Sequence, residues 1–380
     1  MTRLARTTLY GSIAAAALCL TASQSFAVEP GDFQATLRGA TIGIPLGAAP
    51  PPGLYMSLET FNGPNGQGVG QNGAAAGADG GHGLTVFGEA VAPSLAWSTG
   101  WNFLGGNVVF AVVQPFFTVA GLQTNCTTVT NGCAGSPPIA FGTGAGAFFE
   151  NVHNTVWSGA LSWNWKNGWF TSLGFNLQGP DGSQYNGTLN QDYWTFSPTA
   201  AIAYLDKTWK LAANLEYDVH TASAGHTGTY AAVNSNVAGI PAVVAPNGCV
   251  GYNCPGIGYT TGNQLFIDWS AEYKWSKFSF GPVGYFKYQT TSDSPGSGYT
   301  CAGLSASVFY GPSLSCGRAT DIALGGILGY DLGGAEIETW ITDSVYTRDD
   351  FDGLSIFTRL SFKLEGLEPA APAPMVTKAH

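Results

Sequence analysis

Twelve segments of the chain alternate between apolar or aromatic residues and polar residues at every second position, and this period constrains the fold most. A period of two sends successive side chains to opposite faces of a β-strand. Gly, Thr, Ser, Val and aromatic residues dominate the composition, which favours strands and loops over helices. The sequence therefore predicts an all-β protein. The predicted strands are residues 53–61, 83–97, 103–118, 154–165, 168–178, 193–205, 208–219, 263–275, 277–290, 320–331, 335–346 and 353–364.

The connections between these predicted strands are of two kinds. Those after even-numbered strands are mostly very short, whereas those after odd-numbered strands include the longest loops. Short turns at one end of a sheet and long loops at the other are typical of outer-membrane barrels, whose short turns face the periplasm. An even number of strands also returns both chain ends to that side. The short connections include residues 166–167, 206–207, 276 and 333–334, and the longest loops are 119–153, 220–262 and 291–319.

The segment FIDWSAEYKW, residues 266–275, shows how the two faces of a strand differ. Ile267 and Trp269 point to one face, while Asp268 and Glu272 point to the other. A soluble sandwich gives the same alternation, with apolar residues inside and polar residues outside. The period alone therefore does not tell which face meets lipid.

The tryptophans decide between a soluble sandwich and a membrane barrel. Membrane barrels have an aromatic belt at each interface, whereas we expect a sandwich core to place Trp near the middle of its strands. The predicted strands are also long enough for the roughly 9–11 residues that cross a bilayer at barrel tilt. We therefore predict a membrane-spanning antiparallel up-and-down β-barrel of about 12 strands, with lipid outside and charged groups inside. Seven of the 11 tryptophans lie at or next to short turns: Trp97, Trp101, Trp163, Trp165, Trp169, Trp209 and Trp275.

The two ends of the chain carry different signals. Arg3 and Arg6, an apolar run over residues 13–20 and the tripeptide Ser-Phe-Ala ending at Ala27 are typical of a cleaved export signal. Together with the barrel, this signal predicts the outer membrane of a Gram-negative bacterium. The predicted parts are a signal peptide, 1–27, an N-terminal periplasmic or plug segment, 28–52, the transmembrane barrel, 53–364, and a disordered Pro/Ala-rich tail, 365–380.

Six cysteines follow the predicted cleavage site and fall as three close pairs in long loops. Export permits disulfides, and pairing within each loop is the simplest connectivity. A zinc site is the alternative, but the chain has no Cys-x-x-Cys spacing and no His beside a cysteine. The candidate disulfide residues are Cys126 with Cys133, Cys249 with Cys254, and Cys301 with Cys316.

Sequence motifs for catalysis are absent. There is no Gly-x-Ser-x-Gly elbow, His-Glu-x-x-His motif or phosphate-binding Gly loop. A formal net charge of −10 also argues against nucleic-acid binding. We expect no enzymatic activity and no cofactor or metal, although a lipid-cleaving barrel and a calcium site formed by loop aspartates are alternatives. The residues weighed for these alternatives, and interpreted as loop residues that meet water, are His153, His220, His226, Asp293, Asp349 and Asp350.

Several stretches resemble one known family. They are PPPGLYM at 50–56, YWTFSPTAAIAYL at 193–205, YTTGNQLFIDW at 259–269, YFKYQTTSD at 285–293 and FTRLSF at 357–362. Together they resemble the outer-membrane family named for the meta-pathway of phenol degradation, over most of residues 50–364. The resemblance implies a channel for small, often aromatic or hydrophobic compounds, with an architecture similar to long-chain fatty-acid transporters. Two features depart from the family, namely GPDGSQYN at 179–186 in place of a Pro-Thr-Gly turn and a tail that continues past the last strand.

The inward face of the predicted barrel carries the hypothesis on function. Its charged residues form either a ladder of opposite charges that fills a narrow barrel or a constriction that sets selectivity. Its aromatic residues favour passive uptake of small hydrophobic or aromatic molecules, with that solute and membrane lipid as partners. The alternative is a structural or adhesive barrel whose disulfide-stapled loops bind a partner. The lumen-lining candidates are Lys210, Glu216, Asp268, Glu272, Lys274, Lys287, Glu336, Glu338, Arg359, Phe266, Tyr285, Trp340 and Phe357.

Overall fold

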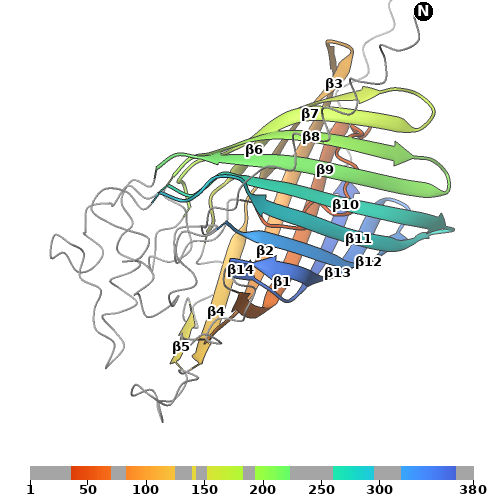
Figure 1. Ribbon diagram of the computed structural model, residues 1–380. Helices are drawn as coiled ribbons and strands as arrows, with labels where there is room; N and C mark the ends of the chain where they lie inside the picture. The colour runs from red at the N-terminus through yellow and green to blue at the C-terminus, as the bar shows by residue number, and fades with distance from the viewer. Residues whose placement is uncertain are drawn as a thin grey trace, which may run out of the picture.

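The computed structural model describes residues 36–69, 83–124, 139–142, 152–182, 193–222, 260–294 and 318–364. It shows a closed β-barrel of 12 antiparallel strands, as predicted (Figure 1). Each strand pairs with its neighbour around the ring, and β1 closes the ring by pairing with both β2 and β15. No helix among the described residues is long and apolar enough to cross a membrane.

The barrel strands agree closely with the alternating segments of the sequence. Three further strands extend the sheet without belonging to the ring: β4 (Phe116–Thr124), β5 (Ile139–Gly142) and β14 (Asp350–Phe351). The ring consists of β1 (Gly53–Val69), β2 (Gly83–Phe103), β3 (Gly106–Val113), β6 (Val156–Asn164), β7 (Trp169–Gln178), β8 (Thr195–Leu205), β9 (Trp209–His220), β10 (Gln264–Trp275), β11 (Phe278–Gln289), β12 (Thr320–Asp331), β13 (Ala335–Arg348) and β15 (Leu354–Lys363).

The strand predicted over residues 103–118 is interrupted in the structure and forms β3 and the start of β4. The chain turns at Leu104 and Gly105, which both have positive φ angles, and β3 ends before Gln114 and Pro115. Proline has no backbone N–H to donate to a ladder. Beyond Pro115 the chain continues as β4, which pairs with the first half of β2 in the same register in which β3 pairs with its second half. The ladder with β6 includes β3 alone.

The short turns are formed by residues that accept positive φ. The Trp169 N–H donates to the Lys166 carbonyl oxygen at 3.1 Å, and the two residues between them, Asn167 and Gly168, have the positive φ angles of 51° and 84° that a type I′ turn requires. In the next turn the Asp206 carboxylate accepts hydrogen bonds from the backbone N–H groups of Thr208 and Trp209, each at 2.6 Å. These local bonds fix the register of β6 with β7 and of β8 with β9.

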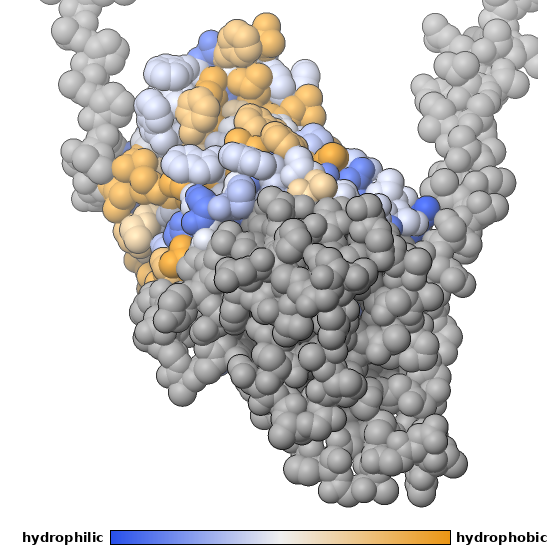
Figure 2. All heavy atoms as spheres, turned by 90° about the vertical axis from the view of Figure 1, so that its left-hand side faces the viewer, coloured by the Kyte–Doolittle hydropathy of each residue, from blue (hydrophilic) through white to orange (hydrophobic). Residues whose placement is uncertain are grey.

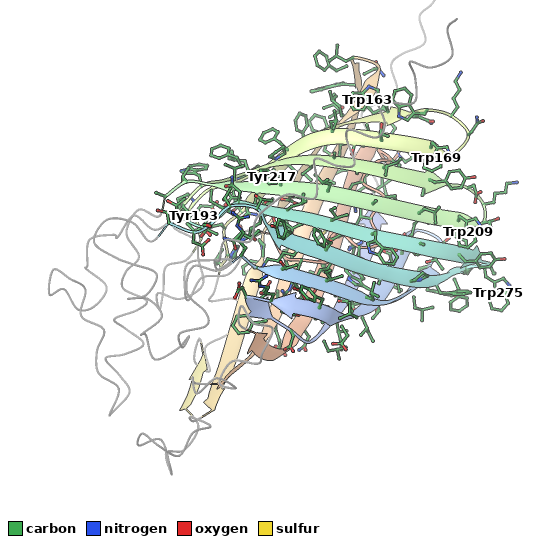
Figure 3. The ribbon with its side chains drawn as sticks, viewed as in Figure 1. Trp163, Trp169, Tyr193, Trp209, Tyr217 and Trp275 are labelled. Atoms are coloured by element: carbon green, nitrogen blue, oxygen red, sulfur yellow. The ribbon has the colours of Figure 1, made fainter. Side chains whose placement is uncertain are left out.

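The outward face of the barrel is apolar and carries aromatic side chains near both ends. Apolar side chains, orange in Figure 2, gather on the outside of the described part. Trp163, Trp169, Trp209 and Trp275 lie along the end that carries the short turns (Figure 3), and Trp275 is 66% exposed. Near the opposite end, the exposed rings are Trp194, Phe196 and Phe175. This distribution is the one expected for lipid around the barrel and water at both rims.

Candidate functional site

The candidate site is the interior of the barrel, where the inward faces of the strands meet. All 13 residues predicted to line the lumen occupy inward positions of their strands, where they alternate with the outward apolar residues. Two lie near the rim with the short turns: Lys274 donates to the Asp206 carbonyl oxygen at 3.1 Å, and the Glu336 side chain is 46% exposed. Whether these residues line a conducting path stays a prediction.

Residues 36–49 of the N-terminal segment lie inside the barrel and contact its walls on several sides. The Asp268 carboxylate of β10 accepts hydrogen bonds from the backbone N–H groups of Gly39 (3.1 Å) and Thr41 (2.9 Å). Arg359 of β15 reaches the same stretch from another wall, because its guanidinium donates to the carbonyl oxygens of Ala40 and Ile42, each at 2.8 Å. A segment bonded to both β10 and β15 crosses the interior.

Further bonds hold this segment along its length. Asn214 of β9 donates to the carbonyl oxygens of Thr41 and Ile44, both at 2.9 Å. The Ser162 hydroxyl of β6 donates to the Gly47 carbonyl oxygen at 2.6 Å. These side chains satisfy backbone groups that have no strand partner, which a buried irregular segment needs. Two of its glycines are also required, since Gly39 has a φ of +81° and a Cβ on Gly43 would lie 2.9 Å from the Ile327 side chain.

Arg359 is the centre of the first buried charge network. Its guanidinium pairs with Glu59 at 3.0 Å and with Glu338 at 3.2 Å. The same group lies 4.5 Å from the centroid of the Trp340 ring. The guanidinium therefore contacts two carboxylates, the Trp340 ring and the two carbonyl oxygens of the N-terminal segment. The network ties β1, β13 and β15 to the segment.

Lys210 holds the second network, towards the short-turn end. Its ammonium pairs with Glu338, with Glu272 at 3.1 Å and with Glu336 at 3.4 Å. Glu272 also accepts a hydrogen bond from Ser279 at 2.8 Å. One cation thus faces three carboxylates.

The third network lies around Arg38, a residue that was not predicted from the sequence. Its guanidinium pairs with Asp321 at 2.8 Å and with Asp350 at 2.9 Å, and Lys287 pairs with Asp350 at 2.6 Å. The Tyr285 hydroxyl donates to Asp321 at 2.6 Å. Arg38 is the only Lys or Arg of the predicted segment 28–52. This single positive charge, in a segment predicted to enter a barrel with many inward acids, could have identified Arg38 as an ion-pair partner.

Aromatic rings form an apolar cluster between these networks. The rings of Trp340 and Phe357 are stacked with centroids 4.9 Å apart, and Phe61 packs on Phe357 at 4.7 Å. Ile42 of the N-terminal segment is fully buried in the same cluster, next to Tyr285. The barrel interior therefore combines an aromatic surface with paired charges.

Several loop residues interpreted as meeting water are in fact buried, so that interpretation is wrong for them. Asp293, Asp349 and Asp350 are 6%, 1% and 7% exposed, and His153 and His220 are 2% and 8% exposed. Asp350 is held inside by its ion pairs with Arg38 and Lys287, and Asp293 accepts a hydrogen bond from the Gly262 N–H at 2.6 Å. His226 and the six candidate disulfide cysteines lie outside the described residues.

Asp349 gives a testable pH dependence of stability. It lies in the turn between β13 and β14, and burial raises its pKa to about 7. An unfolded aspartate titrates near ~4, so the folded barrel binds this proton more tightly and loses stability as pH rises through this window. Asn at this position is expected to raise the free energy of unfolding at pH 8 by on the order of 1–3 kcal/mol, because it carries no charge and accepts the φ of 53°.

The test is urea unfolding of Asp349→Asn at pH 5 and pH 8. The difference from the unsubstituted protein should be large at pH 8 and small at pH 5. Asp343→Asn is the matched control, because it removes the same charge from an exposed position of β13. An equal effect of Asp349→Asn at both pH values contradicts the prediction.

Comparison with solved structures agrees with the fold. The COG4313 outer membrane channel from Pseudomonas putida F1 aligns with a TM-score of 0.52 and 9% identity, over 83% of this chain and 97% of that chain. A Pseudomonas aeruginosa FadL homologue gives 0.37 and 9% over 89% and 99%. The Pseudomonas putida toluene transporter TodX gives 0.35 and 10% over 90% and 95%. The likeness to the first of these shows the fold of an outer-membrane barrel.

No curated protein sequence matches the chain. A family model described as "Putative MetA-pathway of phenol degradation" matches residues 66–360. This match spans most of the barrel and well over half of the chain, and it agrees with the resemblance seen in the sequence. The chain therefore belongs to this family.

Proposed function

We propose that the protein is an outer-membrane channel for passive uptake of small hydrophobic or aromatic compounds. The observation that carries the proposal is the inward-facing aromatic cluster, in which Trp340 and Phe357 stack inside a barrel otherwise lined by charges. The description of the family, which names phenol degradation, supports the same solute class.

The arrangement of the interior suggests how such a solute passes. Trp340 and Phe357 are fully buried while residues 36–49 lie against them, so an apolar molecule gains contact with these rings when part of that segment is displaced. Residues 36–49 occupy the interior, and we propose that they act as a plug. A solute then moves past them only when some of their bonds to Asp268, Asn214 and Arg359 open.

The proposal includes the parts of the chain that precede and adjoin the barrel. We propose export through a signal peptide cleaved after Ala27 and disulfides within three loops, all outside the described residues. We propose no enzymatic activity. Among the described residues, no group of three or more His, Cys, Asp or Glu side chains could hold a metal ion.

A structural or adhesive barrel remains the second candidate. It is favoured by the dense packing of the interior, in which several charged residues are almost fully buried in ion pairs. Such a barrel binds its partner through the external loops and conducts no solute. Two results would favour this candidate over a channel. A deletion strain would take up every aromatic compound normally, and a partner would be captured through those loops.

Initial uptake of radiolabelled toluene and phenol by intact cells tests the channel. A deletion strain should take up these solutes more slowly than the complemented strain, and permeabilising the outer membrane should abolish the difference. Trp340→Ala should reduce uptake, whereas Trp157→Ala, on the outward face with 57% exposure, should not. Equal uptake by all strains overturns the proposal, provided that folded barrel is present in the membrane.

A further inference from the structure

One group of interior acids has no basic partner. The ion pairs formed by the described residues include neither Glu216 nor Asp218, which are successive inward residues of β9. Asp218 is 1% exposed, and neither of its carboxylate oxygens makes a hydrogen bond of normal geometry. The neighbouring inward acid, Asp268, differs because backbone N–H groups and a hydroxyl of the N-terminal segment bind both its oxygens.

Oxygen atoms surround this pair of carboxylates. One Glu216 oxygen accepts hydrogen bonds from the Thr36 hydroxyl and the Asn176 amide, each at 2.9 Å. The Ser197 hydroxyl lies beside both carboxylates, is 1% exposed, and also makes no hydrogen bond of normal geometry. Ser197 therefore adds an almost fully buried hydroxyl oxygen beside the two carboxylates.

Two adjacent buried carboxylates without a counter-charge are unfavourable. Each loses hydration on burial, and their mutual repulsion adds to that cost. A bound cation or a shared proton relieves the repulsion. Carboxylates and a hydroxyl are hard oxygen ligands, which suit Ca²⁺ better than a transition metal. A divalent charge also matches the two carboxylates.

We propose that Glu216, Asp218 and Ser197 bind a divalent cation of the Ca²⁺ class inside the barrel, with water completing its coordination. The described part of the chain brings together fewer than three acidic or histidine ligands here, so water has to supply several positions, as Ca²⁺ sites allow. The cation lies next to Thr36. It neutralises the wall to which the start of the described N-terminal segment is bonded.

Calcium binding to the purified full-length protein in detergent, free of lipopolysaccharide and stripped with EDTA, tests the site. Isothermal titration with CaCl₂ at constant ionic strength should show saturable binding, and Ca²⁺ should raise the thermal unfolding midpoint. Asp218→Asn and Glu216→Gln should each weaken binding by about tenfold or more. Asp343→Asn, which removes the same charge from an exposed outward position, should leave binding unchanged.

Ser197→Ala keeps both carboxylates and replaces the acid variants in the test if those fail to fold. This variant should weaken Ca²⁺ binding without abolishing it. Absence of saturable binding to the unsubstituted protein overturns the proposal. So does an equal loss of binding in Asp343→Asn. An Asp218→Asn barrel that is more stable than the unsubstituted one, without any response to Ca²⁺ in either, shows a shared proton instead and likewise overturns it. None of these outcomes depends on solute uptake.

Discussion

Deletion of residues 28–50 is expected to raise the ionic conductance of the barrel in planar bilayers severalfold. The physical reason is the position of the segment, whose described part is bonded to β6, β9, β10 and β15 across the interior. Barrels of eight strands are filled by side chains and those of 16 or more leave a channel. A barrel of 12 strands lies between these cases, so a single peptide segment can decide whether it conducts.

The barrel itself should survive this deletion. Its strands are joined by continuous antiparallel ladders, and the closure of β1 with β15 begins at Tyr55, after the deleted residues. Asp268, Asn214 and Arg359 lose their partners on the segment, but water that enters the opened interior can replace them. Heat-modifiable mobility on gels checks that the deleted protein is folded before its conductance is measured.

A single substitution tests whether weaker binding of the N-terminal segment opens the barrel while the barrel wall stays intact. Asp268→Asn removes the charge that binds the backbone N–H groups of Gly39 and Thr41. This variant should show brief openings rather than a permanent increase in conductance, because the other bonds remain. Asp343→Asn, exposed on β13, should behave as the unsubstituted protein. Unchanged conductance after deletion rules out the plug.

The strand positions could be predicted because the two faces of each strand meet different media. Lipid outside and charges inside force alternation along every strand, as in β10, where Ile267 and Trp269 oppose Asp268 and Glu272. The alternation of apolar and polar residues does not reveal where one strand ends and the next begins when the alternation continues across the turn. The turn between β2 and β3 was expected at residues 98–102 but lies at Leu104 and Gly105, and the pairing with β2 continues through β4 as far as Thr124, beyond the predicted end at 118.

The residues inside the barrel could be predicted as a set, but their partners could not. Alternation places Arg359 and Glu338 inside, yet the pairing of Arg359 with Glu59 and Glu338 depends on the closure of β1 on β15. The bond from Arg38 to Asp321 joins positions almost 300 residues apart, and no local pattern encodes it. The same limit explains why buried loop acids such as Asp349 were expected to meet water.

Substitution of Arg359 by Met is expected to destabilise the folded barrel by about 3–5 kcal/mol, the usual cost of breaking a buried pair by removing one partner. Glu338 keeps Lys210 as a partner, whereas Glu59 loses the only ion pair that the described residues give it. The carbonyl oxygens of Ala40 and Ile42 lose their donors as well. Urea titration of the folded form, followed by gel mobility or Trp fluorescence, measures the change.

The double variant Arg359→Met with Glu59→Gln shows whether the loss comes from an uncompensated charge. Neutralising Glu59 should recover part of the lost stability, giving a coupling energy of on the order of 1–3 kcal/mol between neighbours in one network. Lys277→Met, at an exposed turn, is the control for removing a positive charge and should change stability by less than about 0.5 kcal/mol. If the double variant is as unstable as Arg359→Met alone, the effect comes from lost packing on Trp340 and lost bonds to the N-terminal segment, and Glu59 has no part in it. Recovery would instead show that Arg359 and Glu59 compensate each other's charge inside the barrel, so that the pair stabilises the fold only while both partners are present.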